Sequence, residues 1–185
     1  MPTFPPSTER LDSSAAESKM QTEIWDLYTE DGARSECRIL RGEPIPQGYY
    51  HLVSEILVRH IDGDYLLMQR DPRKQSYGGR FEASAGGSAM AGEDAITCAK
   101  RELWEETGLT AHEWKHLGSC RSGNEMYHQF LCLTDCPKSS VRLQEGETVS
   151  YRWLSEAEFA AFVRSGEMID FQREHFADYF EKMKY

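Results

Sequence analysis

Hydrophobic residues alternate with polar ones over most of the chain after residue 23, which predicts a domain rich in β-strands. Between residues 23 and 40, two alternating or aromatic-rich runs flank Asp31-Gly32, a dipeptide typical of hairpin turns. Residues 51–60 are apolar and β-branched, a turn signal follows at 62–64, and residues 65–70 return, so a second hairpin is expected. The same pattern predicts further strands at residues 81–85, 113–120, 126–134 and 149–153.

Three segments have a helical pattern instead. Residues 93–107 open with acidic residues and stop at Gly108, because glycine readily adopts the left-handed conformation that ends a helix. Ser155 and Glu158 make a capping box for a helix that extends through Arg164. The aromatic-rich residues 171–183 predict a last helix.

The first twenty residues differ from the rest of the chain. They contain three prolines and four serines with almost no periodic apolar pattern, which predicts a flexible tail at residues 1–20. Residues 21–185 are expected to form a single domain, with residues 23–48 as a hairpin extension and residues 49–185 as its core.

Charge and cysteine usage narrow the class of protein. A net charge of -10 argues against binding to a nucleic-acid backbone, which requires a basic surface. The five cysteines form no CxxC pair, and no secretory signal precedes the domain, so we expect reduced thiols and a cytoplasmic location. No apolar run approaches the length of a membrane span, so no membrane partner is expected.

The candidate chemistry lies in the predicted helix at residues 93–107. Glu102, Glu105 and Glu106 are spaced i, i+3 and i+4, so their carboxylates project from one helix face and repel one another. A hard divalent cation such as Mg²⁺ or Mn²⁺ would relieve that repulsion, because it prefers oxygen ligands. Arg101 can pair with a carboxylate and fix its rotamer, and a main-chain carbonyl at Gly86 could complete the metal shell.

A Glu-x-x-Glu-Glu segment alone is usually a solvated, glutamate-rich helix. The wider pattern is more specific: Gly87, five residues, Glu93, seven residues, and then R-E-L-W-E-E-T-G-L, with a glycine again at 108. This pattern resembles the Nudix box at every defining position. The resemblance implies a Nudix-type α/β/α sandwich, an α/β (α+β) fold with a mixed sheet, here carrying the N-terminal hairpin extension.

The resemblance also implies roles for individual residues. Glu102, Glu105 and Glu106 match the metal-ligand glutamates, and Arg101 matches the arginine that orients them. Glu93 matches the earlier glutamate that supports the site or takes part in it. The implied activity is hydrolysis, by metal-activated water, of a phosphoanhydride bond in a nucleoside diphosphate derivative or similar small diphosphate.

The general base stays open among several glutamates. Glu105 or Glu106 could serve, and in this family the base can also lie outside the box. Glu125 at the start of a predicted strand, and Glu145 and Glu147 in a following loop, are then the candidates, although each is more often a solvent-facing carboxylate.

A second set of weaker candidates is basic. Arg70, Arg73 and Lys74 could hold a substrate phosphate, because guanidinium groups match phosphate geometry, but an ordinary basic surface loop fits them equally well. His112 and His116 are four residues apart, which would suit a metal on a helix. A loop and a strand are predicted there, so we assign them no role.

Residues 23–58 resemble the N-terminal extension of Nudix proteins related to isopentenyl-diphosphate isomerase, including His51 and the later Glu125. That isomerase is one alternative, but the cysteine it needs before the box is missing from the segment FEASAGGSAMAGE. A non-catalytic nucleotide-binding module is another, although such modules usually lack box glutamates. The sequence leaves open which diphosphate is bound, and a homodimer through the aromatic hairpin is a further hypothesis.

Overall fold

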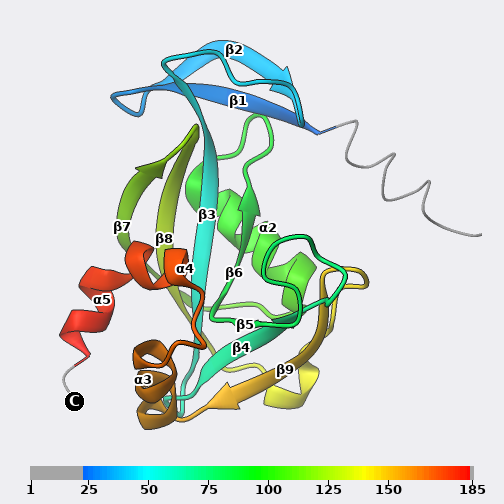
Figure 1. Cartoon of the computed structure of the whole chain (residues 1–185), viewed down its shortest axis with the longest axis vertical. Coiled ribbons are helices and arrows are strands. Elements are labelled where there is room, and N and C mark those ends of the chain that lie inside the picture. Colours follow the sequence, from blue (N-terminus) through cyan, green and yellow to red (C-terminus); the bar gives the residue numbers. More distant parts are fainter. Residues whose placement is uncertain (1–22, 184–185) are drawn as a thin grey trace, which may run out of the picture.

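The N-terminal hairpin predicted from the sequence is present at one end of the molecule (Figure 1). The computed structural model describes residues 23–183, so the predicted tail at residues 1–20 lies outside the described residues. Strand β1 (Ile24–Thr29) pairs antiparallel with β2 (Arg34–Leu40) and, on its other edge, with the long strand that follows the hairpin. Four consecutive residues of β1 are buried, so the hairpin is packed onto the domain.

A long central strand, β3 (Tyr49–His60), organises the mixed sheet. It pairs antiparallel with β1, with β4 (Tyr65–Arg70) and with β6 (Ser84–Ser88), and parallel with β8 (Glu125–Thr134). Strand β7 (Glu113–Ser122) extends the sheet beyond β8, while β9 (Thr148–Leu154) and β5 (Phe81–Glu82) pair with β4. The predicted mixed sheet is therefore confirmed.

The single strand predicted at residues 81–85 is wrong in one respect, because the structure divides it into β5 and β6. The first part pairs with β4 and the second with β3, so the chain changes partner between them. At the change, the Ala83 N–H donates to the Gln172 side chain at 3.1 Å rather than to a strand. A distant helix thus completes the hydrogen bonding that a continuous strand would supply.

Alternate residues of β3 and β4 face opposite layers. Ile56 and Leu66 pack with helix α2 (Ala95–Thr107) on one face of the sheet. Leu57 and Leu67 pack on the other face with α3 (Glu156–Arg164) and the C-terminal segment. Because successive strand residues point to opposite sides, both faces are covered, and the predicted α/β/α arrangement is present (Figure 1).

The helix ends follow their predicted signals. The Asp94 side chain caps the start of α2 by accepting from the Thr97 N–H at 2.8 Å. Gly108 ends the helix with φ 68°, and its N–H donates to the Trp104 carbonyl at 2.9 Å. The capping box between Ser155 and Glu158 opens α3 as predicted.

The predicted last helix at residues 171–183 is two short helices instead. Helix α4 (Asp170–His175) and helix α5 (Ala177–Lys182) are separated at Phe176, whose φ and ψ are -100° and 13°. Phe176 is 2% exposed and packs into the core, so the chain bends there to bury the ring. A 3₁₀ turn at Lys138–Ser140 is the remaining short element. Within residues 23–183, no helix is long and apolar enough to cross a membrane.

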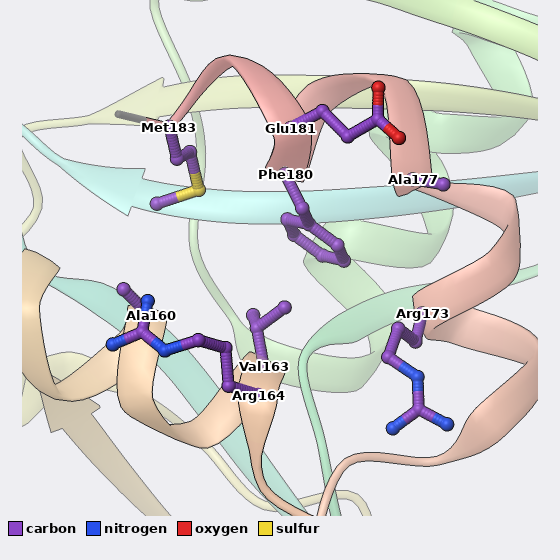
Figure 2. Close-up of a pocket in the computed structure, with 8 residues that line it drawn as sticks. All are labelled: Ala160, Val163, Arg164, Arg173, Ala177, Phe180, Glu181 and Met183. Atoms are coloured by element: carbon purple, nitrogen blue, oxygen red, sulfur yellow. The ribbon is translucent and has the colours of Figure 1, made fainter. Parts of the chain in front are cut away.

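The C-terminal helices also enclose an apolar cavity of about 280 Å³ against α3 (Figure 2). Val163, Phe180 and Met183 line it, with Arg164 and Arg173 at its sides. The predicted box residues do not line this cavity, so it is separate from the predicted site.

Candidate active site

The three glutamates of the box lie on α2 where this helix packs against β3 and β6. The side chain of Glu102 is only 13% exposed, whereas that of Glu105 is 48% exposed. Glu106 accepts a hydrogen bond from the Gly86 N–H at 2.9 Å, which ties it to β6. The predicted helix face is therefore directed partly into the protein and partly toward solvent.

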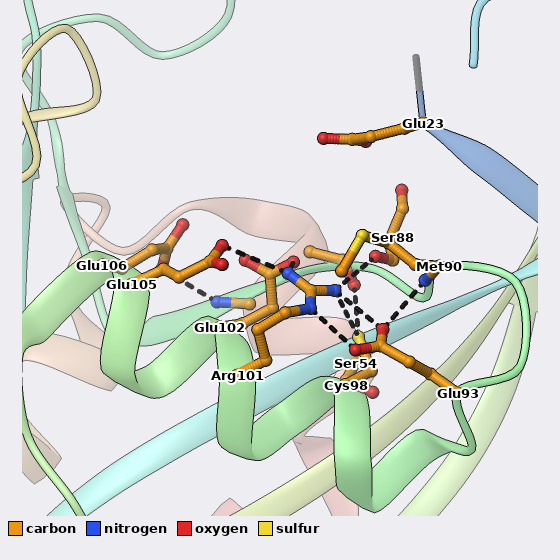
Figure 3. Close-up of polar contacts among 12 residues, drawn as sticks. Glu23, Ser54, Ser88, Met90, Glu93, Cys98, Arg101, Glu102, Glu105 and Glu106 are labelled. Atoms are coloured by element: carbon orange, nitrogen blue, oxygen red, sulfur yellow. Dashed lines mark hydrogen bonds and ion pairs between the residues drawn. The ribbon is translucent and has the colours of Figure 1, made fainter. Parts of the chain in front are cut away.

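Arg101 is the hub of the hydrogen bonds around the box (Figure 3). Its Nε and Nη2 donate to the two oxygens of Glu93 at 2.8 and 2.9 Å. Its Nη1 donates to Glu102 at 2.6 Å and to Glu105 at 3.2 Å. A further bond of 3.0 Å reaches the Ser88 carbonyl on β6. The guanidinium therefore fixes the carboxylate rotamers.

The pKa shifts of Arg101 and Glu93 favour their charged forms, unlike those of Glu102 and Glu106. Burial alone would raise the pKa of Glu93, but hydrogen bonds from Arg101 and from the Met90 N–H lower it. Burial opposes the charged form of Arg101, yet Glu93 and Glu102 raise its pKa. The Arg101–Glu93 pair is thus held in its ionised state.

Two box carboxylates, those of Glu102 and Glu106, have too little positive charge around them to offset the effect of burial on their pKa. Burial raises the pKa of Glu102, although Arg101 partly offsets the effect. Burial raises the pKa of Glu106 well above its usual value, and the neighbouring carboxylates of Glu82 and Glu102 raise it further. Like charges this deeply buried are costly unless a cation neutralises them.

A pocket of about 170 Å³, called the carboxylate pocket below, lies beside Glu106. Glu82, on β5, lines it with Glu106 and was missed by the sequence analysis. Arg70 donates to the two oxygens of Glu82 at 2.9 and 3.2 Å, but burial still raises the pKa of Glu82. The pocket is lined by Val53, Ser54, Glu55, Arg70, Glu82, Gly86, Glu106, Tyr127, Phe171 and Gln172.

The C-terminal helix α4 forms one wall of the carboxylate pocket through Phe171 and Gln172. His175, on the same helix, is paired with Glu55 of β3, with 2.8 Å between Nδ1 and the carboxylate oxygen. Tyr127 of β8 packs on the His175 ring at 4.5 Å between centroids. The sequence analysis missed this pair as well, because 120 residues separate its members.

The weaker basic candidates are all paired within the protein. Arg70 binds Glu82 beside the pocket. Arg73 donates to Asp71 at 2.7 Å, and Lys74 contacts Glu147. Of the three, the structure brings only Arg70 to the lining of the carboxylate pocket.

The candidate bases outside the box differ in their relation to Glu106. Glu125 begins β8 as predicted, accepts from the Tyr127 hydroxyl, and lies 3.8 Å from His51. Glu147 contributes to the raised pKa of Glu106 but, like Glu145, is not among the described residues that line the carboxylate pocket. None of the three is joined to the box by a hydrogen bond among the described residues.

The box nevertheless fits a hard divalent cation. Among residues 23–183, no group of three or more His, Cys, Asp or Glu side chains is already spaced to hold a metal ion. One reason is that Arg101 and the Gly86 N–H engage the box carboxylates. The backbone does leave room for them: a Cβ on Gly87 would lie 2.5 Å from a Glu102 oxygen. A carboxylate-rich cradle with surplus negative charge matches the oxygen preference of Mg²⁺ or Mn²⁺.

Glu106→Gln should be more stable than the wild type at neutral pH when metal is absent, by about 1 kcal/mol or more. The fold raises the pKa of Glu106, so the native state keeps a proton that the unfolded chain loses near pH 4.3. Stability from this group is therefore present at low pH and falls as the pH rises. Glutamine does not titrate, so the difference between the two proteins should grow as the pH rises above about 4 in urea unfolding with EDTA. A difference that does not change with pH would contradict this prediction.

Comparison with known proteins identifies the family to which this mixed sheet and its glutamate-bearing helix belong. The NUDIX domain model matches residues 50–178. The chain is 29% identical to an uncharacterized Nudix hydrolase of Listeria monocytogenes over 153 residues, covering 80% of this chain and 89% of that protein. It is 23% identical to a Nudix hydrolase of Deinococcus radiodurans over 133 residues, covering 70% and 78% of the two chains.

Solved structures agree on the fold. A crystal structure of a Deinococcus radiodurans protein superimposes with a TM-score of 0.66 at 19% identity, covering 88% of this chain and all of that one. The MutT protein of Methanosarcina mazei gives a TM-score of 0.54 at 20% identity, with 72% and 92% coverage. Since the domain model matches more than half of the sequence, the chain belongs to the Nudix family and is a Nudix hydrolase.

Proposed function

We propose that this Nudix hydrolase cleaves a phosphoanhydride bond in a nucleoside diphosphate derivative or similar small diphosphate, with Mg²⁺ or Mn²⁺. The observation that carries the proposal is the cluster of largely buried carboxyl groups of Glu82, Glu102 and Glu106 beside an open pocket, because burial disfavours their charged forms unless a cation is present. A site of this kind suits a cation together with the diphosphate that the cation neutralises.

Glu102, Glu105 and Glu106, with the Gly86 carbonyl, are the groups that would hold the cation. When bound, the cation neutralises the diphosphate and lowers the pKa of water at the reacting phosphorus. Glu102 enters this set with its rotamer fixed by Arg101 at 2.6 Å. Arg101 therefore acts as a positioning residue, with Glu93 holding its other edge at 2.8 and 2.9 Å.

The proton of the attacking water needs a carboxylate acceptor with a raised pKa near the operating pH. Glu106 is a candidate because burial raises its pKa, and Glu82 joins it because it lines the same pocket. Arg70 keeps one face of Glu82 occupied at 2.9 Å and so sets its orientation. Glu105, Glu125, Glu145 and Glu147 remain weaker candidates for the base.

Two alternatives have less support. An isomerase would need a thiol just before the box. The nearest one is that of Cys98, within the box helix, which is fully buried and donates to the Gly87 carbonyl at 3.4 Å. Burial raises the pKa of Cys98 to about 12, so its thiolate is not available at neutral pH. The resemblance of the N-terminal extension to that of proteins related to isopentenyl-diphosphate isomerase therefore stays a prediction, and it does not support isomerase activity.

The other alternative is a non-catalytic binding module. The Nudix domain of Shewanella oneidensis NrtR, solved with ADP ribose, has a TM-score of 0.50 and 16% identity over 60% of this chain and 77% of that one. The complete set of box glutamates in this chain favours hydrolysis over binding alone. A homodimer through the N-terminal hairpin also stays a prediction; Ile24 and Leu40 leave 44% and 43% of their surface exposed there.

The test is a hydrolysis screen with Mg²⁺ and then Mn²⁺ over nucleoside triphosphates, nucleotide sugars, dinucleotides, ADP-ribose, coenzyme A and isoprenoid diphosphates. We expect phosphate or nucleotide release from at least one compound, loss of turnover with EDTA, and recovery when metal is returned. Mass spectrometry of products formed in ¹⁸O-water identifies the phosphorus attacked. A folded, metal-loaded preparation that binds a compound without releasing product from any of them would support the binding module instead.

A further inference from the structure

Two histidines meet on the β7–β8 hairpin, on the other side of the sheet from the C-terminal helices. The Nε2 atom of His116 lies 3.2 Å from the Nδ1 atom of His128, and the ring centroids are 5.3 Å apart. The strand register shifts between His116 and Gly118, where β7 carries one extra residue. His116 is opposite Phe130 and His128 is opposite Ser119, so the two histidines are diagonal neighbours across the paired strands.

These rings line a pocket that the proposed hydrolysis does not use. The histidine pocket, of about 440 Å³, lies between the turn of the N-terminal hairpin, the start of α2 and strand β8. Met126, His128 and Phe130 alternate along β8 and therefore share one face of the sheet. Met126 is 8% exposed and lines the same pocket as both histidines. The carboxylate pocket contains none of these residues.

We propose that His116, His128 and Met126 form a binding site for a copper(I) ion. Two imidazole nitrogens bound to one metal ion at 2.0–2.1 Å lie about 3.3 Å apart at a tetrahedral angle, close to the 3.2 Å that separates them here. Imidazole binds copper well, and thioether sulfur is a soft ligand that selects copper(I) over Mg²⁺ or Zn²⁺.

The charge balance of the pocket also favours a monovalent ion. Two neutral imidazoles and a thioether bring no negative charge, and the carboxylate of Asp94, which also lines the pocket, is offset by Arg34. A divalent ion would therefore be poorly compensated there. Arg34 also lines the pocket, but its guanidinium donates to the Glu93 carbonyl at 2.5 Å and to the Tyr28 hydroxyl at 3.3 Å.

The test is an anaerobic copper(I) titration of the full chain against a coloured chelator. Because thiolates also bind copper(I), the starting protein carries C37S, C120S and C136S, which removes the cysteines that are not buried. We expect one equivalent of copper(I), with affinity about 10-fold weaker in Met126→Leu and about 100-fold weaker in His116→Asn or His128→Asn. His112→Asn is the matched control, since His112 is exposed and contacts Asp135 at 3.8 Å.

Residue-specific evidence comes from methyl-¹³C methionine spectra of the same protein. The Met126 methyl signal should shift on addition of one equivalent of copper(I), and the shift should disappear in His128→Asn. Thermal unfolding of each variant checks that its fold is intact. The proposal is overturned if no copper(I) is taken up, if His112→Asn weakens binding as much as His128→Asn, or if Zn²⁺ binds the site more tightly than copper(I).

Discussion

Replacing Glu106 with glutamine should lower kcat on the substrate found in the screen by on the order of 10³-fold. The glutamine keeps the size of the side chain but removes a buried charge that lies next to Glu82 and Glu102. It should also weaken Mg²⁺ binding, because the cation would lose one of its proposed carboxylate ligands. Steady-state kinetics at several Mg²⁺ concentrations, with isothermal titration of the metal, separate the two effects.

Glu113→Gln is the control for the Glu106 experiment, because Glu113 is exposed and Glu106 is not. Its kcat should stay within about twofold of the wild type. Glu82→Gln tests the residue that the structure adds to the site; a loss comparable to that of Glu106→Gln, with unchanged metal affinity, would assign the general base to Glu82. A Glu106→Gln enzyme with nearly normal kcat would contradict the metal site proposed at the box.

The sequence was sufficient wherever a local signal decided the structure. The box helix ends at Gly108 because only a residue tolerant of φ 68° continues the chain there, and that glycine was visible in the sequence. The capping box at Ser155 is equally local. The pairing of Arg101 with Glu105 also follows from i to i+4 spacing along one helix.

Residues joined across the sheet could not be predicted in this way. Glu82 lies near Glu106 only because β5 pairs with β4 before the chain changes partner and β6 pairs with β3. Glu55 meets His175 because α4 folds back over the strand. Nothing in either local sequence marks such a pairing, so the composition of the carboxylate pocket required the tertiary structure.

The basic loop illustrates a different limit of sequence reasoning. Arg70, Arg73 and Lys74 suggested phosphate binding by their side-chain chemistry alone. In the structure each has an acidic partner, in Glu82, Asp71 and Glu147 respectively. A substrate phosphate would have to compete with those carboxylates, so their charge cannot be counted as free for binding.

Replacing Gly86 with alanine should destabilise the protein by about 3–5 kcal/mol, a large part of the stability of an ordinary domain. A Cβ at this position would lie 2.1 Å from the Ser54 carbonyl oxygen and 3.1 Å from the Glu55 Cα. Both belong to the backbone of β3, and Ser54 is completely buried, so neither atom can move without breaking the β3–β6 ladder. The melting temperature should fall by roughly 10 °C or more.

Two other glycines provide the comparison that makes the Gly86 experiment specific. A Cβ on Gly166 would meet nothing within 4 Å, so Gly166→Ala should leave the melting temperature nearly unchanged. A Cβ on Gly87 would meet the Glu102 carboxylate, at 2.5 Å, rather than backbone. That side chain can rotate, so Gly87→Ala should melt much closer to the wild type than Gly86→Ala while losing metal affinity and turnover. Equal melting temperatures for Gly86→Ala and Gly166→Ala would show that β6 can move away from β3. The close approach of these strands would then not explain why the residue before the box is glycine.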